Sequence, residues 1–114
     1  MDKFREMNRR RIEAHQKLVA SGSKVYRAFL EMEKAAFADG ALPKKTKELI
    51  AIGISVVTNC ESCMQWHIGQ AVKAGASEQE VLEAIEVALE MGIGPATVNA
   101  RFALEVMDEE FRTA

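Results

Sequence analysis

The only two cysteines of the chain lie three residues apart, in the segment Cys60-Glu61-Ser62-Cys63, and His67 follows four residues after the second. Two thiols at this spacing can form a disulfide within one helical turn, and a histidine one turn further on can move their protons. In a reducing compartment such a cysteine pair is more typical of catalysis or metal binding than of a structural cross-link. This cluster is therefore the candidate site.

If residues 60–75 form a helix, the side chains of the cluster lie on one face of it. With about 100° of rotation per residue, Cys63 lies about 60° and His67 about 20° from Cys60, so all three side chains share one side. The start of a helix stabilises a thiolate through its unpaired amides and its dipole, which lowers a cysteine pKa. His67 stands at i+4 from Cys63, where helical side chains meet, so its ring could accept the thiol proton.

Glycines, prolines and capping residues divide the chain into helix-length segments, and no strand-like alternation is present. Pro43 suits the lead-in to the third helix, Thr58 or Asn59 the cap of the fourth, and Ser77 with Glu80 forms a capping-box pair for the fifth. We expect an all-α, single-domain bundle of five or six helices over residues 1–114, with an N-terminal helix in 1–22 and a core in 23–114. The expected helices cover residues 2–20, 23–38, 44–58, 60–75, 78–92 and 95–110.

A possible orienting partner for the histidine comes from the third predicted helix, which is apolar nearly all round in its second half and should be buried. Its acidic residue Glu48 lies about ten residues before the turn at Thr58-Asn59, and His67 lies about eight after it. If the third and fourth helices form an antiparallel pair, the two residues differ in level by only about 3 Å. Glu48 is thus a candidate acceptor for the imidazole.

Together, Glu48, Cys60, Cys63 and His67 resemble the motif of the alkylhydroperoxidase D and carboxymuconolactone decarboxylase family: a glutamate, then Cys-x-x-Cys, then x-x-x-His. The flanking segments Trp66-His67 and Ala74-Gly75-Ala76-Ser77 are also similar, and the resemblance covers about residues 30–110. It implies an all-helical subunit that assembles into trimers or hexamers, with a thiol-based, peroxiredoxin-type peroxidase or disulfide reductase activity.

The resemblance also implies roles for these residues. One cysteine attacks the peroxide and becomes a sulfenic acid, the other resolves it to a disulfide, and Glu48 with His67 forms a proton relay. Cys63 is assigned as the attacking thiol because His67 is its neighbour, while Cys60 is the alternative as the first cysteine of the pair. Ser62 stands where some peroxidase members have a histidine, so one possible relay member is absent.

Three alternatives to this function remain, the first from the family resemblance and the other two from the residues. The first is a carboxymuconolactone decarboxylase-like enzyme, although decarboxylases of the family generally lack the cysteine pair. The two thiolates, the imidazole of His67 and the carboxylate of Glu48 could instead bind zinc. The third is a non-catalytic helical oligomerisation protein whose thiols only sense oxidation. We predict no organic cofactor, because no nucleotide loop, flavin fingerprint or haem attachment motif is present.

Charge and hydropathy restrict the partners. The net charge of −2 argues against nucleic-acid binding, and the run Arg9-Arg10-Arg11 is expected to be a solvated helix face. The longest central stretch without charge, Leu49 to Cys60, is too short to span a membrane, and the N-terminus lacks the apolar core of a signal peptide. We expect a cytoplasmic homo-oligomer that uses a small peroxide or disulfide substrate and a thiol electron donor, without nucleic acid or membrane.

Overall fold

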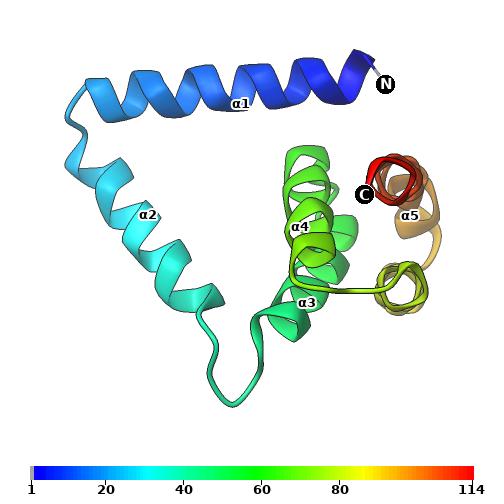
Figure 1. Cartoon of the computed structure of the whole chain (residues 1–114). Helices are drawn as coiled ribbons and strands as arrows, with labels where there is room; N and C mark the ends of the chain where they lie inside the picture. The colour runs from blue at the N-terminus through cyan, green and yellow to red at the C-terminus, as the bar shows by residue number, and fades with distance from the viewer. Residues whose placement is uncertain (1) are drawn as a thin grey trace. The chain divides into compact units, whose positions relative to one another are not determined.

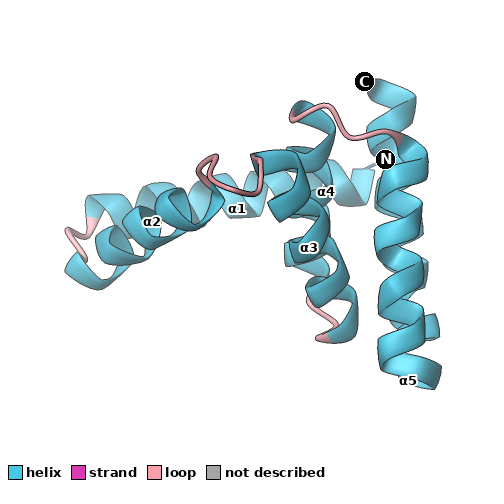
Figure 2. Cartoon of the chain, turned by 90° about the horizontal axis from the view of Figure 1, so that it is seen from below, coloured by secondary structure: helices cyan, strands magenta, loops and turns pink. Residues whose placement is uncertain are grey.

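The computed structural model describes residues 2–114, and within them every regular element is a helix. The prediction of an all-α protein is confirmed, with five helices (Figures 1 and 2). The chain forms two compact units, and the boundary between them in the sequence follows Ala38. The helices are α1 (Asp2–Ala20), α2 (Lys24–Phe37), α3 (Lys44–Val57), α4 (Glu61–Lys73) and α5 (Glu78–Thr113).

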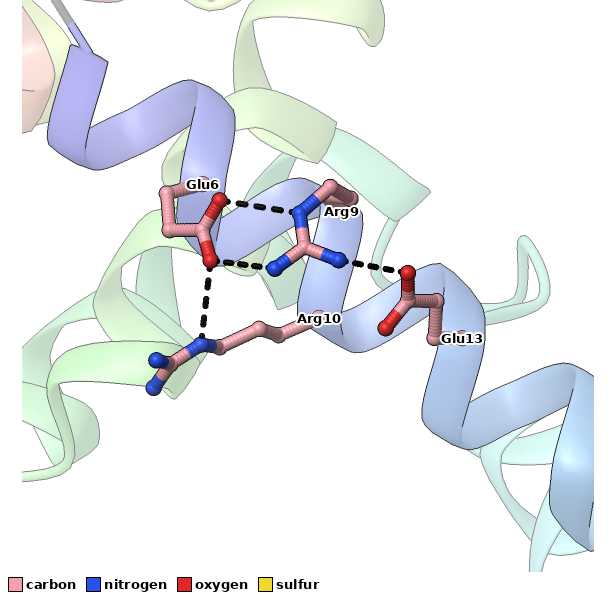
Figure 3. A network of polar contacts seen from close by, with 4 residues as sticks. All are labelled: Glu6, Arg9, Arg10 and Glu13. Carbon is pink, nitrogen blue, oxygen red and sulfur yellow. Dashed lines mark hydrogen bonds and ion pairs between the residues drawn. The ribbon is translucent and has the colours of Figure 1, made fainter.

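The first unit consists of α1 and α2. On α1, Arg9 bridges Glu6 and Glu13, and Arg10 also pairs with Glu6 (Figure 3). The hydrogen bond from Arg9 lowers the pKa of Glu6 to about 2. More than half of the side-chain surface of Arg9 and of Arg10 is exposed, and both are stabilised by pairs one turn apart. The prediction of a solvated face does not hold for Arg11, which is only partly exposed and whose pKa is lowered by burial.

The second unit packs α3, α4 and α5 around one apolar core. Ile52 and Val56 of α3 are fully buried, as the sequence predicted for this helix. The other side of α3 was also expected to be buried, but Ile50, Ile54 and Val57 are 48%, 59% and 45% exposed. These three residues, spaced by four and three, form what we call the α3 stripe. The remaining core side chains of this unit are Met64, Ile68, Ala71, Ala76, Val81, Ile85, Ala88, Ala96, Ala100, Ala103, Val106 and Met107.

The turn from α3 to α4 is a Schellman motif, the common way of ending a helix with one left-handed residue. The N–H of Cys60 donates to Ser55 O at 3.0 Å, and the N–H of Asn59 donates to Val56 O at 3.2 Å. Asn59 is the left-handed residue, with φ of 55°. The prediction that Thr58 or Asn59 caps α4 was wrong: both still belong to the end of α3, and Cys60 is the N-cap.

The last helix begins with the predicted capping box, in which Ser77 and Glu80 exchange hydrogen bonds between side chain and backbone. It breaks at Ile93, whose φ of 51° and ψ of −129° are not helical. The two predicted helices that meet between Gly92 and Pro95 are therefore halves of α5, joined directly by this break. In Figure 1 the halves appear as separate coils, one yellow-green and one orange to red.

Candidate functional site

The two cysteines lie at the first turn of α4 and are joined by a disulfide. Cys60 is the N-cap residue, and its sulfur accepts a hydrogen bond from the N–H of Cys63 at 3.2 Å. That N–H is one of the donors that a helix start leaves without an intrahelical partner. The sulfur of Cys60 therefore takes the place of the side-chain oxygen that usually caps a helix.

A contact from a distant part of the chain supports this turn. The side chain of Asn99, in the second half of α5, donates from Nδ2 to the carbonyl oxygen of Val56 at 2.8 Å. Val56 belongs to the last turn of α3, and its oxygen also accepts the N–H of Asn59. The backbone that leads into Cys60 is thus held by both α3 and α5.

Behind the cysteines, the structure brings Glu48 of α3 and His67 of α4 together. His67 Nδ1 lies 2.7 Å from Glu48 Oε1, at the level that the antiparallel helix pair predicts. Glu48 is buried, with 1% of its surface exposed. If the Glu48 carboxylate is ionised, it can only accept this hydrogen bond, so the imidazole donates from Nδ1 and Nε2 is the ring nitrogen without that proton.

The second oxygen of the same carboxylate has its own cationic partner. Lys44 Nζ lies 2.8 Å from Glu48 Oε2, one helical turn earlier on α3. A buried carboxylate is stabilised when both oxygens are hydrogen-bonded and a cation balances its charge. Glu48 has both kinds of partner, so its carboxylate is held in place beside the imidazole.

Exposure increases along this face of α4 toward its start. Ala71 is fully buried, the side chain of His67 is 16% exposed, and both cysteines are partly exposed. A small reactant could therefore approach the sulfurs while Glu48 is shielded from water. With the sulfurs joined, the thiolates that the zinc alternative requires are absent from this state. Among residues 2–114, no group of three or more His, Cys, Asp and Glu side chains is arranged to hold a metal ion.

Two contributing residues were missed by the sequence reasoning. Lys44 could have been found, because a lysine four residues before a glutamate on one helix is a familiar pairing distance. Asn99 could not, because its contact with Val56 spans 43 residues of sequence. The four predicted residues Glu48, Cys60, Cys63 and His67 do lie at this site, and their catalytic roles stay predictions.

Comparison with known proteins agrees with this architecture. The model of the carboxymuconolactone decarboxylase family matches residues 23–106, and the chain belongs to this family. A protein of Paracoccus denitrificans, uncharacterised protein 4 in the cox locus, is 45% identical over 89 residues, which are 78% of this chain and 80% of that protein. An uncharacterised protein of Cupriavidus necator is 38% identical over 81 residues, which are 71% and 72% of the two chains.

Two solved structures are similar over nearly the whole chain. A carboxymuconolactone decarboxylase family protein from Legionella pneumophila has a TM-score of 0.91 and 35% identity, covering 96% of this chain and 98% of that one. A family protein from Thermotoga maritima, whose description connects it with the antioxidative response, has a TM-score of 0.84 and 30% identity, covering 95% and 91%. Among residues 2–114, no helix has both the length and the apolar character needed to cross a membrane.

Proposed function

We propose that this protein is a thiol-dependent peroxidase or disulfide oxidoreductase that cycles Cys60 and Cys63 between dithiol and disulfide. One observation carries the proposal: the disulfide lies at the start of α4, with Cys63 one helical turn before His67, which is hydrogen-bonded to buried Glu48. Redox pairs need a way to move protons to and from their sulfurs, and the Glu48-His67 pair is suited to that task.

The proposed peroxide reaction has three steps. The thiolate of Cys63 attacks one peroxide oxygen, the O–O bond breaks, and the released alkoxide takes a proton to leave as an alcohol. Cys60 then attacks the sulfenic acid of Cys63, forming the disulfide and releasing water. Two thiol groups of an electron donor reduce the disulfide and become a disulfide themselves. Peroxide is reduced by two electrons in each cycle.

The two cysteines have different surroundings, which supports different roles for them. Cys63 is one turn from His67, so its proton has an acceptor nearby. Cys60 has the helix-start N–H of Cys63 against its sulfur, a contact that stabilises negative charge on Cys60 in the reduced protein. A stabilised thiolate at Cys60 can attack the sulfenic acid in the resolving step. It is also a good leaving group when a donor thiolate attacks the sulfur of Cys63.

The relative from Thermotoga maritima supports an antioxidant role, since its description concerns the antioxidative response. A disulfide that must be reduced in every cycle suits a compartment rich in thiols, so cytoplasmic location is part of the proposal. The decarboxylase alternative takes support only from the family name, because no feature of this site addresses a lactone.

The decisive experiment is mass spectrometry of the reduced protein before and after one equivalent of peroxide. We expect the loss of two hydrogens, located at Cys60 and Cys63 by peptide mapping. Cys60→Ser should instead stop at a sulfenic acid on Cys63, which dimedone captures, whereas Cys63→Ser should give no rapid product. Ser62→Ala is the control and should behave as the unmodified protein. No mass change, or turnover in both cysteine variants, would refute the proposal, and stoichiometric zinc in the purified protein would favour the metal alternative.

We also propose that the working form is a homo-oligomer, with trimers or hexamers expected from the family. The α3 stripe supports this, because three large aliphatic side chains on one helix face are about half exposed in the single chain. Ile54→Glu should reduce the subunit number measured by light scattering, and Ile54→Leu should preserve it. An unchanged oligomer in Ile54→Glu would show that the stripe is not an interface.

A further inference from the structure

Lys44, Glu48 and His67 form a continuous chain of charged and polar contacts. Lys44 contacts one carboxylate oxygen of Glu48 at 2.8 Å, and His67 contacts the other at 2.7 Å. The side chain of Glu48 is 2% exposed, whereas that of Lys44 is 41% exposed. The chain therefore leads from the surface, through a buried anion, to the imidazole.

The charges in this chain restrict the protonation of the histidine. A buried carboxylate needs a nearby cation, because its desolvation is not otherwise offset. If His67 were the only candidate, it would take a proton and fill that role. An imidazolium has no lone pair on Nε2 and cannot accept a thiol proton.

We propose that Lys44 is a positioning residue that serves as the counter-ion of Glu48, so that His67 stays uncharged with its proton on Nδ1. The consequence for catalysis rests on the proposed function, in which His67 accepts a proton from Cys63. The effect on the histidine does not depend on that function and can be measured in the resting disulfide form.

The position of Lys44 suits this task because both its backbone and its side chain are held. Its N–H donates to the side chain of Asp39 at 2.7 Å, which caps the start of α3 in place of Pro43. Its ammonium group then reaches back along the helix to Glu48. An arginine at this position preserves the charge, and a methionine preserves most of the apolar stem without it.

Two other charged groups of the packed helices, Lys45 and Glu110, lie at other places. On α3, Lys45 pairs with Glu80 of α5. On α5, Glu110 lies against Gly69, which is about 200° around α4 from His67. On α4, Cys63 lies one turn before His67 and does not titrate while it is in the disulfide. Lys44 is thus the cation that contacts Glu48 directly from α3.

The test is nuclear magnetic resonance of the histidine rings, for which this chain is well suited. It contains two histidines, and His15 of the first unit serves as an internal reference, assigned through His15→Gln. Ring ¹⁵N shifts of the disulfide form at pH 7 report both the tautomer and the protonated fraction of His67. We expect the Nδ1–H tautomer in the unmodified protein. In Lys44→Met, the ratio of protonated to neutral His67 should rise about tenfold, with His15 unchanged.

Three further variants make the result specific. Lys44→Arg should restore the neutral tautomer, and Lys45→Met, which removes a neighbouring lysine, should leave His67 unchanged. In a Glu48→Gln background, Lys44→Met should have little effect, because the carboxylate through which it acts is gone. An unchanged or lower protonated fraction in Lys44→Met, or the same rise in Lys45→Met, would overturn the proposal. The expected ring changes in Lys44→Met without any loss of peroxide reduction would support the role of Lys44 and count against the relay of the proposed function.

Discussion

The side-chain amide of Asn99 donates a hydrogen bond at 2.8 Å to the carbonyl oxygen of Val56. The same oxygen accepts the N–H of Asn59, one residue before Cys60. A residue from the second half of α5 therefore secures the turn that carries the first cysteine. The geometry of the redox pair depends on helix packing as well as on its own four-residue segment.

Asn99→Ala removes this contact and should lower the free energy of unfolding by about 1 kcal/mol, the usual net contribution of one hydrogen bond. Urea unfolding measures the loss, and hydrogen exchange at the amide of Cys60 should become faster. Arg101→Ala, at an exposed site on the same half of α5, is the matched control and should change neither. Equal exchange at Cys60 in both variants would show that Asn99 does not secure the turn.

Asn59 is the left-handed residue of the α3–α4 turn, and Gly75 occupies the equivalent position after α4, with φ of 93°. Asn59→Gly should therefore preserve or slightly raise stability, since glycine adopts this conformation without a steric penalty. Asn59→Val should lower stability by about 1–2 kcal/mol, because a β-branched residue is strained there. Thermal unfolding of the two variants checks the order, which a more stable valine variant would contradict.

Gly92 and Gly94 flank the break in α5 and differ in the space around them. A Cβ on Gly92 would lie 2.5 Å from Cβ of Ala96, whereas a Cβ on Gly94 would meet nothing within 4 Å. Gly92→Ala should lower the free energy of unfolding by about 1–3 kcal/mol through crowding. Gly94→Ala should be neutral or stabilising, since it reduces the freedom of the unfolded chain. Urea unfolding of the pair tests this, and equal effects would rule out crowding at Gly92.

Glu48→Gln keeps the shape of the side chain and removes its charge. Lys44 then loses its anion, and we expect a loss of about 1–3 kcal/mol in stability. The protonated fraction of His67 should fall, the opposite of the change expected for Lys44→Met. If the relay operates, oxidation of the reduced protein by peroxide should slow by about tenfold or more. Glu86→Gln, an exposed glutamate on α5, is the control. An unchanged oxidation rate in Glu48→Gln would remove Glu48 from the relay.

Adjacent residues Glu109 and Glu110 should respond to pH with opposite signs. Burial raises the pKa of Glu110, so its effect on stability becomes unfavourable as the pH rises through that raised value. The hydrogen bond from Arg112 lowers the pKa of Glu109, so its favourable contribution is present at neutral pH and is lost in acid. Glu110→Gln should therefore stabilise the protein at neutral pH, and Glu109→Gln should destabilise it. Both differences should shrink in urea titrations toward about pH 3, and identical signs would contradict the assignment.

Local signals made much of this fold predictable. Pro43, the Ser77-Glu80 pair and Gly75 mark helix ends through rules that act over a few residues, and the structure follows them. The nearness of Glu48 and His67 could also be predicted, because a short turn between two helices fixes which residues lie at the same level.

Other features required the folded chain. The N-cap role of Cys60 was missed because a sulfur is an unusual capping group. Asparagine is a common N-cap residue, but Asn59 belongs to the turn that ends α3. The sequence could not show that the α3 stripe is half exposed. Both sides of α3 carry isoleucine and valine, so residue type does not tell the exposed side from the buried one. The contact between Asn99 and Val56 depends on long-range packing that no local pattern encodes.

The capping role of Cys60 has a consequence for the stability of α4 during the redox cycle. Its sulfur holds the N–H of Cys63 while bonded to the other sulfur, and a reduced Cys60 in the same rotamer would hold it too. The start of α4 therefore has the same backbone partner in both oxidation states. The first turn of α4 would then keep its cap throughout the cycle, so neither oxidation nor reduction would carry the free-energy cost of a lost helix cap.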